Sequence, residues 1–90
     1  MKYPKHCIPV KATLEDGSQY YGGVHVMQQQ RILDLLCDER DFIPFSLRDR
    51  IILVNKSKIV RLDILEMSEI KEKKDILPEV NFDYLNANNW

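Results

Sequence analysis

The chain has 90 residues, of which 44% are hydrophobic and 30% charged, and its formal net charge is −1. This length accommodates one domain around one core, and the composition is that of a folded globular protein rather than a disordered or fibrous chain. A chain this close to neutrality has no general attraction for nucleic acid or anionic membranes. Binding of that kind would need a local cluster of charges.

The longest uncharged apolar run covers only residues 51–54, whereas a membrane-spanning helix needs about 20 apolar residues. The first residues lead into no apolar signal segment. We therefore expect no membrane association and a cytoplasmic location. Only two cysteines are present, Cys7 and Cys37, and we expect both thiols to be reduced there.

Alternation of apolar and polar residues over positions 8–14 predicts a first β-strand with one buried face. Pro9 has no amide hydrogen, so it belongs near the start of this strand or on a sheet edge. Asp16-Gly17 follows at once, and this dipeptide between alternating segments predicts a tight hairpin turn.

A second strand is predicted over residues 18–27, with Val24 and Val26 on the same face as Tyr20 and Gly22. The pair Gly22-Gly23 inside a strand predicts a bulge or a sharp bend. Either would curl a short sheet toward closure.

The period then changes from two to that of a helix. Ile32, Leu35 and Leu36 lie at helical spacing among charged residues, which predicts a short amphipathic helix over residues 29–38. We expect its apolar stripe to cover an open end of the sheet.

Three further segments complete the predicted sheet. Residues 42–47 alternate again, but Pro44 confines that strand to an edge or a bulge. Residues 51–54 are continuously apolar, which fits a central strand covered on both faces. After a polar turn, residues 59–65 form the last predicted strand, with Val60 among its inward-facing residues.

Beyond residue 65 the pattern loosens. Residues 66–74 have the composition for a helical turn or two, which Pro78 would stop. We predict a small β domain over residues 1–65 and a partly ordered C-terminal extension over residues 66–90.

A family resemblance rests on the first hairpin. Leu14, Gly17, Gly22 and Val24 have the spacing found in Sm-like proteins, whose pattern is Leu-x-x-Gly, four residues, Gly, one residue and an aliphatic. The segment resembles that hairpin over about 11 residues. A second resemblance, to uncharacterised small bacterial proteins, rests on residues 31–36, 42–44 and 55–60. The resemblance implies a mainly β fold, a small five-stranded Sm-like or SH3-like barrel, here with a short helix between strands two and three and a C-terminal extension.

The chain departs from the Sm-like pattern where that family contacts RNA. The family has an Asp-x-x-Met-Asn type segment after its second strand, and residues 26–31 of this chain read Val-Met-Gln-Gln-Gln-Arg. Its turn before the last strand contains Ile-Arg-Gly, and this chain has Val54-Asn55-Lys56. The resemblance therefore implies the fold more than it implies RNA binding.

Five cations gather on the last two predicted strands and their turns. They are Arg48, Arg50, Lys56, Lys58 and Arg61. Lined up along one rim, they would bind a protein partner or the phosphates of a nucleic acid. Strand alternation would instead scatter them over a solvated surface, and Asp49 and Asp63 dilute the cluster.

Three aromatic residues, Phe82, Tyr84 and Trp90, stand in the C-terminal segment. Exposed aromatics are frequent anchors of protein interfaces, so these residues are candidate contacts for a partner or another subunit. The alternative is that they complete the core of their own small domain.

No cofactor, metal or catalytic site is predicted. His6, Cys7, His25 and Cys37 are the residue types that bind zinc, but they have no Cys-x-x-Cys or His-x-x-x-His spacing. The acidic residues around positions 34–41 alternate with arginines, as on the solvated face of a helix.

The sequence therefore favours a non-enzymatic interaction or assembly module, joined to a protein partner or to further copies of itself through an edge strand or the C-terminal segment. Sm-like RNA binding is the alternative. A small enzyme is the third possibility, for which no converging set of catalytic residues is seen.

Overall fold

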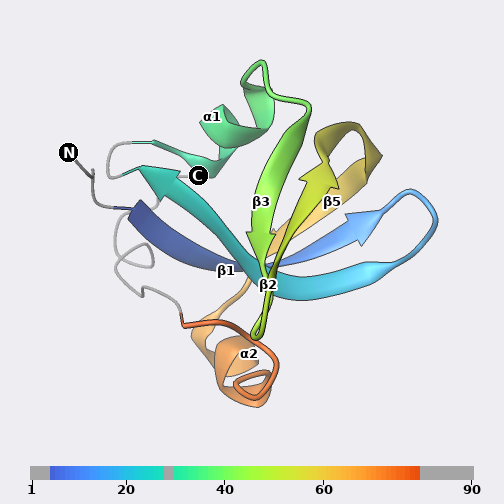
Figure 1. The fold of residues 1–90 in the computed structure, drawn as a ribbon. Helices are drawn as coiled ribbons and strands as arrows, with labels where there is room; N and C mark the ends of the chain where they lie inside the picture. Colours follow the sequence, from blue (N-terminus) through green and yellow to red (C-terminus); the bar gives the residue numbers. More distant parts are fainter. Residues whose placement is uncertain (1–4, 28–29, 80–90) are drawn as a thin grey trace.

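The computed structural model describes residues 5–27 and 30–79 and is mainly β, as predicted (Figure 1). Its elements, in chain order, are β1 (Lys5–Leu14), β2 (Gln19–Met27), α1 (Ile32–Cys37), β3 (Phe42–Ser46), β4 (Ile51–Asn55), the 3-10 turn η1 (Lys56–Lys58), β5 (Ile59–Ile64) and α2 (Met67–Glu72).

The five strands form one antiparallel sheet in the order β4-β3-β2-β1-β5. Four strands follow one another as a meander, and β5 returns to pair with β1. The predicted closed barrel is wrong: β4 and β5 are consecutive in the chain, yet the ladders of the described residues join each to a different neighbour. Both therefore remain edges of an open, curled sheet.

The hairpin predicted at Asp16-Gly17 is confirmed. Gly17 has a φ of 90°, a left-handed conformation that favours glycine. The Asp16 carboxylate accepts a hydrogen bond of 2.8 Å from the backbone N–H of Ser18, which closes the turn. From this turn β1 and β2 pair without a break, from Thr13 opposite Gln19 to the far end of both strands.

Gly22 and Gly23 make close packing possible. Of the two predicted alternatives, a bulge or a sharp bend, the bulge is wrong, because the register of β1 and β2 does not shift at these residues. A Cβ on Gly22 would collide with the Phe45 ring and with the backbone oxygen of Ser46. A Cβ on Gly23, on the opposite face, would collide with the Cys7 sulfur. The glycines thus let neighbouring groups approach the β2 backbone from both faces.

Pro44 lies in β3, an interior strand, so its predicted place at an edge is wrong. The β2 ladder with β3 covers only Val24 opposite Phe45 and Gly23 opposite Ser46. Pro44 comes directly before Phe45 and lies outside the β2–β3 ladder, so its missing N–H breaks no hydrogen bond of that ladder.

The core lies between the concave face of the sheet and the two helices. Its buried residues are Ile8, Val10, Ala12, Val24, Val26, Ile32, Leu35, Ile43, Phe45, Leu65, Ile70 and Leu77. The set includes most of the inward positions predicted for the first three strands, but Tyr20, predicted on the same face as Val24, is 38% exposed. The set also includes Ile70 of α2 and Leu77 beyond it, so the segment after β5 packs against the same cluster as the strands.

Helix α1 covers one end of the sheet through buried Ile32 and Leu35, as predicted, but it is shorter than the predicted span. It begins after Arg31, whose backbone is extended and donates a hydrogen bond of 3.1 Å to the Asp34 carboxylate. This capping interaction satisfies a free backbone group at the first turn. Figure 1 shows α1 and α2 at opposite ends of the sheet.

The two edge strands differ from the prediction. The sequence predicts a central position for β4, whereas among the described residues only β3 lies beside it. In β5, Thr13 pairs with Arg61 and Leu14 pairs with Ile59, so Val60 has no partner. This β-bulge turns Val60 outward to 65% exposure, and its predicted inward position is therefore wrong.

We predict that Gly22→Ala lowers the free energy of unfolding by about 1 to 3 kcal/mol, because the added methyl group overpacks a buried site bounded partly by backbone. Urea unfolding of the purified variant measures this loss. An unchanged midpoint would contradict the packing described above.

Gly23→Ala provides the matched control. Its methyl group meets a side chain rather than backbone, so Cys7→Ala in the same molecule is expected to recover part of the lost stability. For Gly22→Ala no second substitution can relieve the clash, because the added methyl group meets the backbone carbonyl of Ser46.

Candidate interaction surface

The strongest candidate for a functional surface is the outer face of the β3–β4 hairpin. Ile51 and Leu53 of β4 are 66% and 68% exposed, and Phe42 of β3 is half exposed. Pro44 lies directly opposite Leu53 in the ladder and on the same face. We call Phe42, Pro44, Ile51 and Leu53 the β4 surface. Large aliphatic side chains this exposed, contiguous and on an edge strand are unusual for a surface that stays in water.

Within residues 5–27 and 30–79, no strand pairs with the outer edge of β4, which we call its free edge. The N–H of Leu47 donates to the carbonyl of Arg50, and the N–H of Lys56 donates to that of Asp41, so Arg50 and Lys56 direct their backbone groups toward β3. Since this direction alternates along a strand, residues 52 and 54 also face β3. Ile51 and Leu53 therefore direct their N–H and C=O groups away from the sheet.

Lys56, one of the predicted rim cations, is instead bound at the end of α1. Its ammonium group donates hydrogen bonds of 3.3 Å to the Leu35 carbonyl and 2.8 Å to the Asp38 carbonyl, and it also contacts the Asp38 carboxylate. Only 11% of its side chain is exposed. A cation at this position satisfies free carbonyls and favours the helix dipole. Lys56 thereby joins η1 to α1.

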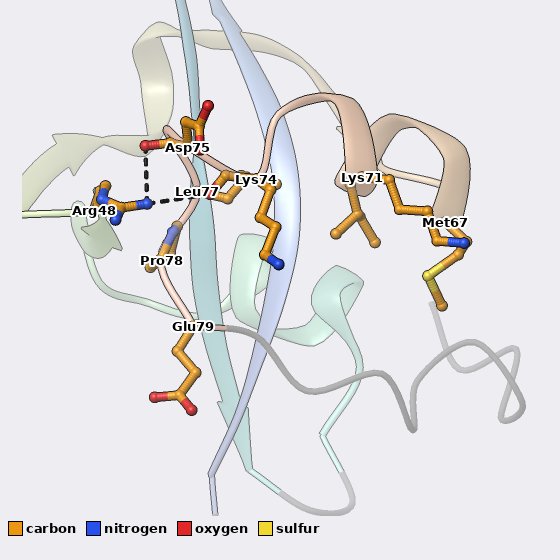
Figure 2. Close-up of a pocket in the computed structure, with 9 residues that line it drawn as sticks. Arg48, Met67, Lys71, Lys74, Asp75, Leu77, Pro78 and Glu79 are labelled. Carbon is orange, nitrogen blue, oxygen red and sulfur yellow. Dashed lines mark hydrogen bonds between the residues drawn. The ribbon is translucent and has the colours of Figure 1, made fainter.

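Arg48 has a similar structural role at the other end of the molecule. Its guanidinium donates hydrogen bonds of 3.3 Å and 3.0 Å to the carbonyls of Lys74 and Asp75, which joins the β3–β4 turn to the segment after α2 (Figure 2).

Beside this contact lies an open groove of about 890 Å³. It is lined by Arg48, Met67, Ile70, Lys71, Lys74, Asp75, Leu77, Pro78 and Glu79. Its charged groups are of both signs, and they do not converge on one point in Figure 2. We therefore assign it no ligand.

The remaining predicted rim cations each contact a carboxylate. Arg50 lies 3.5 Å from Asp49, Lys58 lies 2.9 Å from Glu15, and Arg61 lies 2.6 Å from Asp63. The structure does not gather the five cations on one rim. Arg48 and Arg50 precede β4, Lys56 and Lys58 follow it, and Arg61 is on the opposite edge strand.

A histidine, a serine and a cysteine do come together, on the convex face of the sheet. His25 Nε2 and Ser46 Oγ share a hydrogen bond of 2.6 Å, and Cys7 pairs with His25 across the β1–β2 ladder. Ser46 is 6% exposed, so its hydroxyl is closed to a substrate. Burial raises the pKa of the Cys7 thiol, the opposite of what a reactive thiol needs.

The predicted aromatic anchors Phe82, Tyr84 and Trp90 lie outside the described residues. Within residues 5–27 and 30–79, no group of three or more His, Cys, Asp or Glu side chains is arranged to hold a metal ion. In the same part of the chain, no helix has the length and apolar character needed to cross a bilayer.

The sequence did carry a signal for the β4 surface, the uninterrupted apolar run at residues 51–54. That run predicts a buried central strand because both of its faces are apolar. In the structure the inward residues Ile52 and Val54 are half buried against the core, and the outward residues are exposed.

Comparison of the chain with protein-family models, with curated proteins and with solved structures gives no match.

We predict that Lys56→Met lowers the free energy of unfolding by about 1 to 3 kcal/mol, because the carbonyls of Leu35 and Asp38 lose their donor. Lys58→Met, two residues away, removes only an exposed ion pair and is the matched control, for which we expect little change. Urea unfolding compares the two variants. Equal losses would contradict the role assigned to Lys56.

A second prediction concerns the stability of the protein at acidic pH. Hydrogen bonds from Arg40, and then from Lys56, hold the pKa of Asp38 well below its usual range. A depressed carboxyl pKa gives stability that is present above the ordinary Asp value and lost as the pH falls toward the folded-state value. We therefore expect Asp38→Asn to weaken the dependence of stability on pH between about pH 5 and about pH 2. Denaturant unfolding at these pH values measures it, and an unaltered dependence would contradict the prediction.

Proposed function

We propose that this chain is a non-enzymatic interaction module that binds an extended polypeptide segment along the free edge of β4. The observation that carries the proposal is the exposure of Ile51 and Leu53 on a strand whose outer backbone groups are turned away from the sheet. An added strand would take up those N–H and C=O groups and cover the apolar side chains, as in β-augmentation.

The fold supports an assignment among small Sm-like or SH3-like modules. The strand order, with β5 returning to β1 and a single 3-10 turn between β4 and β5, suits such a module in a form that is open between its two edge strands. Of the two hairpin glycines that carry the resemblance, Gly22 allows close packing on β2 and Gly17 has the positive φ of the turn.

Protein binding has more support than the alternative, Sm-like RNA binding. The cations that RNA phosphates would need are separated along β4 and onto β5, and four of the five contact carboxylates. The β4 surface itself carries no charge. An apolar surface without cations is suited to a polypeptide and not to a polyanion.

A non-enzymatic role is proposed for a related reason. In the group formed by His25, Ser46 and Cys7, the Ser46 side chain is buried and burial raises the pKa of the Cys7 thiol. Nucleophilic catalysis needs an accessible, activated group.

A random-peptide display selection tests the proposal. Peptides selected on the wild-type protein are expected to bind Val60→Lys as well as wild type and to lose at least about tenfold in affinity for Leu53→Lys, equivalent to about 1.4 kcal/mol. Val60 is the matched control because it is an aliphatic residue of similar exposure on the other edge strand. Selected peptides that bind all three proteins equally would contradict the proposal.

A further inference from the structure

We infer that the segment added to β4 is β4 of a second copy of this chain, running antiparallel with Leu53 opposite its own counterpart. This inference rests on the proposed function, since it names the occupant of the same edge. It follows from the backbone direction and from the order of residues in β4.

The backbone groups at the free edge match themselves under two-fold symmetry. With Leu53 opposite Leu53 of the other copy, these two residues exchange N–H···O=C hydrogen bonds, since both face outward. Residue 51 then faces residue 55 of the other copy. The Ile51 carbonyl is placed to accept the N–H of Asn55, which also faces away from β3.

The side chains match in the same register. On the outer face, Leu53 meets Leu53 of the other copy and Ile51 lies beside it. On the inner face, half-buried Ile52 meets half-buried Val54 of the other copy. The strand has no charged residue between Ile51 and Asn55, so this pairing removes no charge from water. A foreign strand would have to supply this apolar pattern, and a second copy has it already.

The charges at the strand ends permit the pairing. Arg50 of one copy falls opposite Lys56 of the other, and two free cations there would repel each other. The Lys56 ammonium, however, is turned beneath α1 against Asp38 and is largely buried, and Arg50 lies beside the Asp49 carboxylate. The structural contact that removes Lys56 from the surface thus also removes the main obstacle to self-pairing.

The contact is small. A five-residue strand with one neighbouring aromatic side chain covers less surface than the roughly 1,200 to 2,000 Å² of standard stable interfaces. We therefore expect a weak dimer whose population rises with protein concentration.

Site-specific disulfide trapping tests both the dimer and its register. Leu53→Cys and Ile51→Cys are made separately in full-length protein carrying Cys37→Ser, so that the exposed native thiol does not react. In the proposed register the two Cα atoms at position 53 are about 5.5 Å apart, within disulfide range. Those at position 51 are four residues out of register, about 14 Å apart.

The expected result is a covalent dimer of Leu53→Cys under mild oxidation with oxidised glutathione, at least about fivefold more than for Ile51→Cys. The two positions share a strand, a face and an exposed fraction, so random collision would trap both equally. Sedimentation velocity of unmodified wild type, over a hundredfold range of concentration, is expected to show the reversible dimer. Circular dichroism verifies that each variant is folded.

Equal trapping at the two positions, or a wild-type protein that is monomeric at every concentration, would overturn the inference. Failure of the proposed function can be distinguished from failure of this inference. If peptides selected on the wild type still depend on Leu53 while the protein is a monomer, the edge binds a foreign strand and only the second-copy inference is lost. If neither peptides nor a second copy depend on Leu53, both are lost.

Discussion

The close approach of Phe45 to Gly22 is the contact on which the rest of the sheet depends. The ring is fully buried, and it lies where any side chain on residue 22 would be. This contact lets β3 lie against β2 although the ladder between them is only two residue pairs long. Because β3 is the strand that β4 pairs with among the described residues, the position of the outer edge of β4 follows in part from the same packing. A core contact thus determines which strand is presented to a partner.

The two ends of the hairpin are held by cations that bind backbone carbonyls. Lys56 binds the last carbonyls of α1 at one end of β4, and Arg48 binds the carbonyls of Lys74 and Asp75 at the other. Carbonyls at the end of a helix or in a turn lack backbone donors, and a long cationic side chain supplies them. These interactions fix both ends of the β3–β4 hairpin to other parts of the fold.

The strands were predictable because their alternating apolar residues and the Asp16-Gly17 turn are local signals. Positions such as Val24, Ile43 and Phe45 are buried as their spacing predicts. Strand order depends on contacts between distant parts of the chain, and for this reason the sequence of residues 51–54 wrongly predicts a place at the centre of the sheet. An apolar residue on a strand looks the same in the sequence whether the core or a partner covers it.

The predicted basic rim is wrong for a related reason. Five Lys and Arg residues close together in sequence suggested one basic rim, but two lie before β4, two after it and one on β5. The carbonyls that Lys56 and Arg48 bind are 18 to 27 residues away in the chain. No short pattern in the sequence connects a lysine with the end of a distant helix. Their structural roles therefore appear only once the chain is folded.

An open sheet with two free edges risks endless edge-to-edge assembly, and the two edges of this sheet differ in how they meet that risk. β5 carries the bulge at Val60 and the charged residues Arg61 and Asp63, which are devices that discourage an added strand. β4 has neither a bulge nor a charge between its ends. Only one edge is thus suited to pairing. Pairing of an edge with its own copy consumes both available edges and closes, whereas pairing of unlike edges would continue into a fibre. The asymmetry of the edges therefore favours an assembly that stops at two chains.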